Sequence, residues 1–293
     1  MWWSLIVVLF TVLQVAVMPL IERKYLSLLQ RRVGPAFVGT KGKYQFIADA
    51  LKLVFKEMTQ PQRVNKIVFK SVTGFCFWCA WFMNVCAIYG PHLAWCDIDY
   101  HLFYVMIFST LGGLSVMVAG LVSRSKYALL GCIRTGIQVV SYEIFFNLVC
   151  LHAIVLGGSL NFMEIINHQT NVWFFYSVAP IAIIGFLIVL LECCRCPFDL
   201  PEAEAELVAG YNVEYGGILF ALFYLAEYFH VWLAGGLYNI LFCGGYNFFF
   251  LNNLFIVFNW FASIIFIFIK IIIIFFFILS INIFEFFELF FIF

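Results

Sequence analysis

Apolar residues fill long stretches of this chain, and shorter polar segments separate them. Predominantly apolar runs of about twenty residues have the length that a membrane-spanning helix requires. In lipid a helix satisfies its own backbone hydrogen bonds. The pattern therefore predicts an all-α polytopic membrane bundle with about seven transmembrane helices, in a single integral domain over 1–293. The predicted spans are 2–21, 71–90, 102–122, 136–156, 173–193 and 216–235, followed by a longer stretch from 251 to 290.

The first polar segment, residues 22–70, contains an amphipathic pattern of its own. Its apolar residues recur at helical spacing, polar residues fall on the other face, and Pro61 marks the end of the helix. A helix lying at the lipid interface and a docking surface for a peripheral subunit both fit this pattern. The apolar positions are Phe46, Ile47, Ala50, Leu51, Val54, Phe55 and Met58, and the polar ones are Gln45, Asp49, Lys52 and Lys56.

The composition fits a membrane protein and excludes an ordinary soluble domain. Hydrophobic residues make up 65% of the chain and charged residues 11%, whereas soluble domains carry about 25% charged residues. The amino terminus lacks the basic segment of a cleavable signal peptide, so we expect the first span to be retained.

Lysine and arginine predict the orientation of the spans. Loops on the cytoplasmic or matrix side of a membrane carry an excess of these residues. We therefore expect the amino terminus outside, on the intermembrane side, and the basic loops in the matrix or cytoplasm. Segments 22–70, 123–134 and 194–215 carry eleven, three and one Lys or Arg, whereas 91–101, 157–172 and 236–250 carry none.

The ten cysteines do not follow a metal-site pattern. Cys76 and Cys79 form a C-x-x-C inside an apolar span, without a second pair at the separation of a zinc site. We interpret the cysteines as small buried apolar residues and expect no metal site. The absence of a glycine-rich nucleotide loop indicates that this chain binds neither NADH nor flavin itself, and we expect no nucleic-acid partner.

Carboxylates at membrane depth are the main chemical signal. Acids in or against a bilayer are costly and are usually retained for proton or ion handling. Glu143, Glu192 and Glu227 lie in three different predicted spans. Each could instead be an acid hydrogen-bonded within the bundle, but three of them beside an acidic loop favour a proton path. The loop, residues 194–215, carries Asp199, Glu202, Glu204, Glu206 and Glu214. His230 is a potential relay neighbour of Glu227 because the two are three residues apart.

Two segments resemble the family of NADH–ubiquinone oxidoreductase chain 1. The first is Arg-Cys-Pro-Phe-Asp-Leu-Pro-Glu-Ala-Glu-Ala-Glu from Arg195, continued by the segment from Glu214-Tyr215 to Glu227-Tyr228. The second is Glu22-Arg23-Lys24, followed by Gln-Arg-Arg-Val-Gly-Pro from Gln30. The resemblance covers nearly all of the chain, from Glu22 to about Lys270.

This resemblance implies a membrane subunit of respiratory complex I in the mitochondrial inner membrane. It implies that the chain forms part of the quinone chamber and the start of an acidic proton-coupling path. Ubiquinone would be the substrate, and flavin mononucleotide and iron–sulfur clusters would lie on partner subunits, so the chain alone would be inactive. The implied partners are peripheral quinone-site subunits, antiporter-like membrane subunits and lipids.

The resemblance also implies roles for individual residues. The implied quinone-chamber residues are Arg23, Gln30, Arg31, Arg195 and Phe198. The implied proton-path residues are Asp49, Glu143, Glu192, Asp199, Glu202, Glu204, Glu206, Glu214 and Glu227. We expect Arg195 to pair with Asp199 or Glu192 and to hold the acidic loop near the chamber.

The sequence departs from the family pattern at its end. In the family a basic matrix loop and an eighth span follow the seventh span, whereas this sequence ends at Phe293 without either. Lys270 resembles the family's lysine near the start of span seven, so 269–289 would be that span and 251–268 an additional apolar segment. We expect a separate short chain to supply the loop and helix, and lipid filling the gap is the alternative.

Two other classes of protein fit the acidic motif. One is the homologous membrane subunit of a hydrogenase-type complex, which would co-purify with a nickel–iron protein. The other is a free-standing proton-coupled transporter, which should show an inverted repeat with broken helices at matching positions. The sequence shows no such pairing.

Overall fold

The computed structural model is a bundle of helices, and no strand occurs among the residues it describes. The predicted all-α class is therefore confirmed. The structure describes residues 2–62, 64–86, 99–170, 172–195, 198, 210–247, 269–276, 278 and 280.

Four of the described helices are long and apolar enough to cross a membrane. They correspond to the second, third, fourth and sixth predicted spans. These helices are α3 (Lys66–Cys86), α4 (His101–Ser123), α5 (Lys126–Gly157) and α10 (Ile218–Phe242). The predicted number of seven spans remains a prediction.

Helix α5 begins ten residues earlier than predicted, so most of the expected loop 123–134 is helical. Ser125 caps the helix, because its side chain accepts a hydrogen bond of 3.2 Å from the Ala128 amide. An N-cap of this kind satisfies one of the free amides of the first turn. Arg124, at φ 54°, ends α4 in the left-handed region. Two residues thus suffice to join two long helices.

The predicted span 173–193 is divided into two helices. These are α7 (Phe174–Ser177) and α8 (Ala179–Glu192), and the chain bends at Val178 between them. Proline in the first turn of α8 favours a new start, because proline has no amide to donate to the preceding turn. At 14 residues α8 is shorter than a usual membrane span.

One short helix was not predicted. Helix α6 (Phe162–His168) lies in the expected loop 157–172 and buries Phe162, Ile165 and Ile166. It covers one end of the bundle, where His101 stacks on Phe162 with ring centroids 5.6 Å apart.

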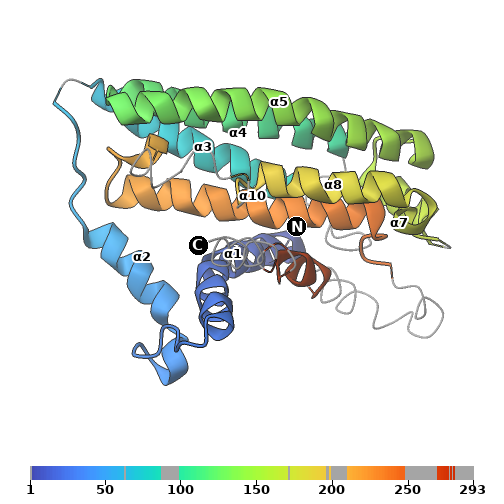
Figure 1. The fold of residues 1–293 in the computed structure, drawn as a ribbon, viewed down its shortest axis with the longest axis horizontal. Coiled ribbons are helices and arrows are strands. Elements are labelled where there is room, and N and C mark those ends of the chain that lie inside the picture. The colour runs from blue at the N-terminus through green and yellow to red at the C-terminus, as the bar shows by residue number, and fades with distance from the viewer. Residues whose placement is uncertain are drawn as a thin grey trace, which may run out of the picture.

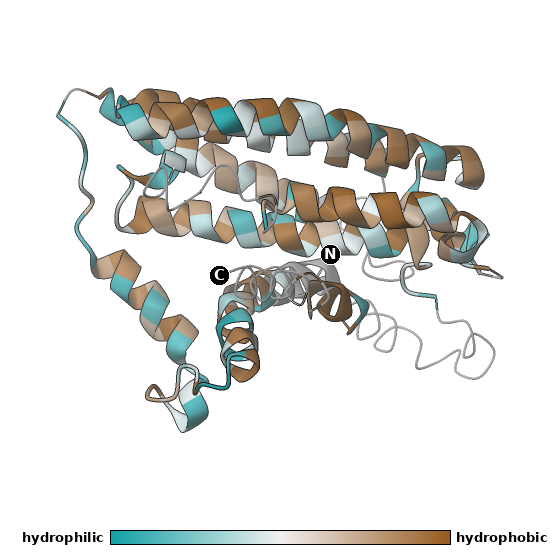
Figure 2. Cartoon of the chain, in the orientation of Figure 1, coloured by the Kyte–Doolittle hydropathy of each residue, from teal (hydrophilic) through white to brown (hydrophobic). Residues whose placement is uncertain are grey.

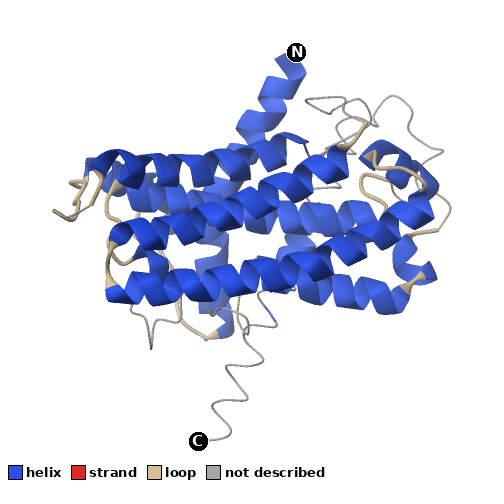
Figure 3. Cartoon of the chain, turned by 90° about the horizontal axis from the view of Figure 1, so that it is seen from above, coloured by secondary structure: helices blue, strands red, loops and turns tan. Residues whose placement is uncertain are grey.

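The long helices pack side by side around α10. Helix α3 contacts α4 and α10, and α5 contacts α4 and α8 (Figures 1 and 3). The buried core follows α10, with Phe223, Phe229 and Trp232 all at 2% exposure or less. Helix α1 (Trp2–Leu29) contacts α10 and runs across the direction of the other helices (Figure 3).

The predicted stretch from 251 to 290 is described only in its later part, where 269–276, 278 and 280 are helical. Ile271 and Phe275 of this part are buried, and Phe276 lies 4.8 Å from Tyr25 of α1 between ring centroids. Segments 251–268 and 281–293 lie outside the described residues. The expectations about them, and about a separate short chain, remain predictions.

Helix α2 (Gln45–Phe55) is the predicted amphipathic helix. It lies at the side of the bundle (Figure 1), where it contacts α1 and α10, and hydrophilic and hydrophobic residues alternate along it (Figure 2). None of its residues is buried, and Phe55 is 81% exposed. This exposed position is compatible with both predictions for the apolar face, contact with lipid and contact with a partner subunit.

Candidate functional site

A cavity of about 140 Å³ lies inside the bundle between α3, α4, α5, α8 and α10. Glu143 of α5, Glu192 of α8 and Glu227 of α10 all line it. A cavity of this size has room for several water molecules, and its acids offer them hydrogen bonds. The structure thus brings together the three acids that the sequence placed in separate spans.

The carboxylates in this cavity have different surroundings. Glu192 is the last residue of α8, and its Oε1 accepts a hydrogen bond of 2.8 Å from the Ser109 hydroxyl of α4. Glu143 has a buried Oε1 without a hydrogen-bond partner among the described residues. A buried acceptor left without a partner costs roughly 1–3 kcal/mol. Water in the cavity or a proton on the acid would remove that cost.

The cavity also touches the start of the acidic loop. Gln138 of α5 lines it and donates a hydrogen bond of 3.1 Å to the Phe198 carbonyl. Phe198, a predicted quinone-chamber residue, packs half-buried against the core. This hydrogen bond holds residue 198 against α5.

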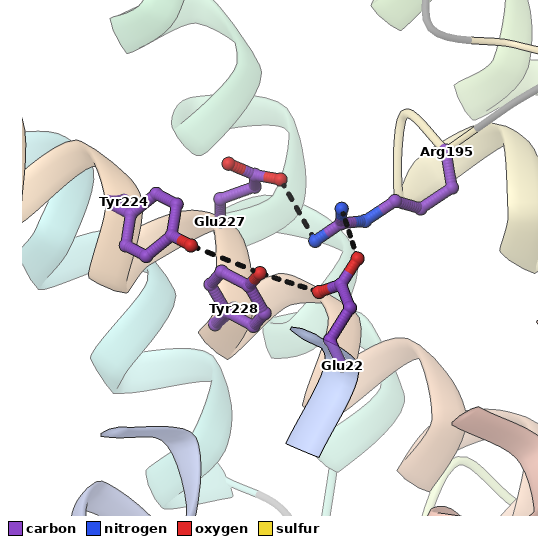
Figure 4. A network of polar contacts seen from close by, with 5 residues as sticks. All are labelled: Glu22, Arg195, Tyr224, Glu227 and Tyr228. Atoms are coloured by element: carbon purple, nitrogen blue, oxygen red, sulfur yellow. Dashed lines mark hydrogen bonds and ion pairs between the residues drawn. The ribbon is translucent and has the colours of Figure 1, made fainter. Parts of the chain in front are cut away.

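A second polar group, which we call the arginine clasp, joins Glu22, Arg195, Tyr224, Glu227 and Tyr228 (Figure 4). The Arg195 Nη1 lies 3.0 Å from Glu22 Oε1, and its Nη2 lies 3.2 Å from Glu227 Oε1. The Tyr228 hydroxyl donates a hydrogen bond of 2.6 Å to the other oxygen of Glu22. Tyr224 and Tyr228 lie 3.3 Å apart between hydroxyls. The guanidinium also stands 5.2 Å from the centroid of the Tyr228 ring.

The clasp is largely removed from solvent. Side-chain exposure is 18% for Arg195, 10% for Glu22 and 24% for Glu227. Burial opposes the charged guanidinium, but the carboxylates of Glu227 and Glu22 outweigh it and raise the pKa of Arg195 well above its ordinary value. A base is charged at every pH below its pKa, and a raised pKa widens that range. The Arg195 guanidinium therefore keeps its charge, and the stabilisation that the charge provides, near neutral pH.

The partners of Arg195 differ from the predicted ones. The structure pairs it with Glu22 and Glu227 instead of with Glu192, and Asp199 lies outside the described residues. The reason is local: Cys194, two residues after the end of α8, has a left-handed φ of 47°, and the Arg195 side chain then extends toward α1 and α10. Glu22 belongs to one of the two family motifs but was not among the predicted site residues.

The remaining predicted residues at the end of α1 lie apart from the cavity lining. Arg23 Nη1 lies 2.9 Å from Asp49 Oδ2, with exposures of 51% and 39%. Gln45 donates a hydrogen bond of 2.9 Å to the other oxygen of Asp49. Gln30 and Arg31 are exposed. Their roles, and that of Asp49 in a proton path, remain predictions.

The acidic loop is described only at its ends. Asp199, Glu202, Glu204 and Glu206 lie outside the described residues. Glu214 is half-buried. Tyr215 anchors this end of the loop, since its ring stacks on Phe69 at 4.2 Å and its hydroxyl donates a hydrogen bond of 3.0 Å to the Ala119 carbonyl.

No group of three or more His, Cys, Asp or Glu side chains that could hold a metal ion occurs in the part of the chain that the structure describes. Cys76, Cys193 and Cys194 line the cavity as separate thiols.

A bundle of long apolar helices with three acids around a cavity defines the class of protein: a polytopic helical membrane protein. Comparison with known proteins identifies the family. The family model for NADH dehydrogenase matches residues 3–284. The chain belongs to this family.

Named relatives agree with this assignment. The NADH-ubiquinone oxidoreductase chain 1 of Chondrus crispus is 43% identical over 241 residues, which cover 82% of this chain and 74% of the relative. The chain 1 of Paramecium tetraurelia is 41% identical over 262 residues, covering 86% and 98%. An NADH-quinone oxidoreductase subunit of Paramagnetospirillum magneticum is 37% identical over 253 residues, covering 83% and 74%.

Proposed function

We propose that this chain is a membrane subunit of respiratory complex I, the proton-pumping NADH–ubiquinone oxidoreductase, and that it forms part of the quinone chamber and the start of the acidic proton path. The supporting observation is the continuity of the arginine clasp with the cavity. Arg195 contacts Glu22 of α1 and Glu227 of α10. Glu227 in turn lines the cavity with Glu143 and Glu192.

In this proposal the chain works through charge and protons. Flavin mononucleotide and iron–sulfur clusters on partner subunits would supply the electrons that reduce ubiquinone. Reduced quinone is anionic until it gains protons, so a negative charge appears beside the acidic loop. Arg195 forms an ion pair with the cavity acid Glu227 and another with Glu22. If Arg195 shifts toward one of these carboxylates, the proton affinity of Glu227 changes.

The change then passes through the cavity to the membrane partners. Glu227, Glu192 and Glu143 come from three helices, so a proton that moves among them crosses the bundle from α10 toward α5. Water in the cavity supplies the intermediate hydrogen bonds. Antiporter-like subunits beside α5 would receive this proton or its electrostatic effect.

We place the protein in the mitochondrial inner membrane, with the amino terminus on the intermembrane side and segments 22–70 and 194–215 in the matrix. The close approach of Gly216 and Gly217, directly after the acidic loop, to Thr59 and Lys56 supports a shared side for these two segments. The positive-inside rule assigns that side to the matrix.

The test replaces single acids by amides in the assembled complex. Glu227→Gln removes a titrating group and also half of the Arg195 pairing, whereas Glu143→Gln removes titration at a residue that forms no ion pair within the described part of the chain. Glu164→Gln, on the exposed face of α6, is the matched control. We expect the two cavity variants to assemble and to lose proton-coupled quinone reduction several-fold, while the control retains it.

NADH oxidation by a water-soluble acceptor, which does not involve the membrane path, should remain unchanged in all three variants. Wild-type proton pumping in an assembled Glu143→Gln and Glu227→Gln complex would refute the proton-path role.

A further inference from the structure

His230 is a fourth ionisable residue on the wall of the carboxylate cavity. It lies on α10, three residues after Glu227, so the two side chains emerge about 4.5 Å apart along one face of the helix. An imidazole is the side chain whose ordinary pKa lies nearest neutrality, and it can donate through one nitrogen while accepting through the other.

The structure makes room for this ring on α4. A Cβ atom placed on Gly112 would lie 3.2 Å from both Cε1 and Nε2 of His230. The Nε2 edge of the imidazole therefore rests where α4 has no side chain. A larger residue at position 112 would push the ring away.

The same face of α4 leads from the imidazole to Glu192. Ser109 lies three residues before Gly112, which is about one helical turn, and its hydroxyl holds the Glu192 carboxylate at 2.8 Å. His230 thus stands against one turn of α4 and Glu192 against the preceding turn. On its own helix His230 lies three residues after Glu227, and all three side chains line the same cavity.

From this arrangement we propose that His230 carries protons between Glu227 and Glu192. One ring nitrogen accepts the proton of the Glu227 carboxyl group, and the other releases its proton to the Glu192 carboxylate, directly or through one water molecule. One O–H bond and one N–H bond break while one of each forms, and no oxidant or reductant is needed. A ring flip or the reverse transfer restores the first tautomer.

The inference rests on the proposed function, since it adds a carrier to the same path. Other ionisable groups face this cavity from every side and share its pH dependence. They are Cys76 of α3, Tyr142 and Glu143 of α5, Glu192 of α8, Cys193, Cys194 and Tyr211 of the connecting segments and Glu227 of α10, with Arg195 and Glu22 behind Glu227.

The first experiment compares His230→Asn with His168→Asn in the assembled complex. Asparagine keeps hydrogen-bonding capacity but does not titrate, and His168 is an exposed residue of α6 that serves as the control. We expect His230→Asn to lower the rate of proton-coupled quinone reduction roughly ten-fold. The rate should also lose the part of its pH profile that reports an imidazole, while the control keeps both.

The second experiment is a double-mutant cycle with Gly112→Ala. The added methyl crowds the imidazole, so we expect a lower coupled rate in the parent chain. In the His230→Asn background the side chain is smaller and carries no proton, and the same substitution should have little further effect. Equal effects in both backgrounds would show that Gly112 acts through packing and not through His230.

The outcomes separate this inference from the proposed function. A wild-type rate and pH profile in assembled His230→Asn, together with a loss of coupling in Glu143→Gln and Glu227→Gln, would overturn the role of His230 alone. Wild-type coupling in all three would overturn both. If His230→Asn does not assemble, His230→Gln and Gly112→Ala in the parent chain replace it, and an unchanged pH profile in those variants overturns the inference.

Discussion

Arg195 forms ion pairs with two carboxylates beside the cavity. It compensates two carboxylates that are themselves mostly buried, Glu22 and Glu227. A buried ion pair adds little net stability, because desolvation offsets the attraction, but removal of one partner leaves an uncompensated charge and costs roughly 3–5 kcal/mol. Replacement of one charged residue of the clasp should therefore destabilise the protein more than the small net contribution of the ion pairs suggests.

Arg195→Ala should strongly destabilise the assembled complex and raise the apparent KM for quinone. Arg195→Lys should have a smaller effect, because an ammonium keeps the charge but lacks the planar fork that reaches both carboxylates. Thermal stability of the purified complex and steady-state quinone kinetics measure the two effects. Unchanged values in both variants would reduce Arg195 to a surface anchor.

Glu22 and Arg23 are neighbours in sequence with different surroundings, so they form a matched pair. Glu22 is 8% exposed and accepts from Tyr228 and Arg195, whereas Arg23 forms an exposed ion pair with Asp49. We expect Glu22→Gln to cost roughly 1.5–3 kcal/mol of stability, as for hydrogen bonds to charged groups. Arg23→Gln should cost about 0–1 kcal/mol. Chemical denaturation of the two variants checks this order, which a larger loss in Arg23→Gln would reverse.

At the scale of single residues, the acids of the cavity were easier to predict from the sequence than the residues that form ion pairs with Arg195. Glu143, Glu192 and Glu227 stand out because each interrupts an apolar run, and all three line the cavity. The partners of Arg195 come from α1 and α10, which helical spacing within one segment does not connect. The signal that could have identified Glu22 is its position: it is an acid at the end of an apolar span, followed by two basic residues.

A close approach between two backbone segments fixes how the elements around the cavity pack. A Cβ atom on Gly131 of α5 would lie 2.9 Å from backbone atoms of Gly210 and Tyr211. These residues begin η2 (Gly210–Asn212), a described turn near the carboxyl end of the acidic loop, and Tyr211 lines the cavity. Because backbone atoms are not free to rotate away, this glycine sets how closely the loop end packs on α5.

Gly131→Ala should displace this turn and destabilise the protein by roughly 1–3 kcal/mol, the usual cost of overpacking. Gly74→Ala on α3 is the control, because nothing lies within 4 Å of its added Cβ. There the higher helix propensity of alanine should stabilise by about 0.5–1 kcal/mol. Unfolding midpoints of both variants in detergent test the difference, and a neutral Gly131→Ala would mean that the turn yields freely.

Element ends were the least predictable feature of the fold. Apolar runs located α3, α4 and α10, but the cap at Ser125 extends α5 by ten residues beyond its apolar run. The bend at Val178 divides a run that looks continuous in sequence. Capping and a bend depend on single hydrogen bonds and backbone angles, which hydropathy does not report.

On the scale of the whole molecule, contacts between distant segments show which loops lie at the same end of the bundle. At one end Gly217, before α10, lies close to the carbonyl of Lys56. At the other end Gln169 donates a hydrogen bond of 2.9 Å to the Ile240 carbonyl near the end of α10. The same end holds Lys270, whose ammonium lies 2.8 Å from each of two carbonyl oxygens, those of Cys243 and Gly245. The basic segments gather at the first end, as the lysine and arginine count leads one to expect.

The two ends should therefore face opposite sides of the membrane, and labelling of single introduced cysteines tests this. Lys126 begins α5 at the basic end, His168 ends α6 at the other, and both are exposed. Lys126→Cys should react with a membrane-impermeant maleimide only from the matrix side, and His168→Cys only from the intermembrane side. The parent chain measures background from native cysteines, five of which are buried among those described. Labelling of both variants from one side would contradict the topology. Labelling from opposite sides but in the reverse sense would agree with the fold and overturn the positive-inside assignment. The contacts fix which loops lie at the same end of the bundle, whereas the charges alone decide which end lies in the matrix.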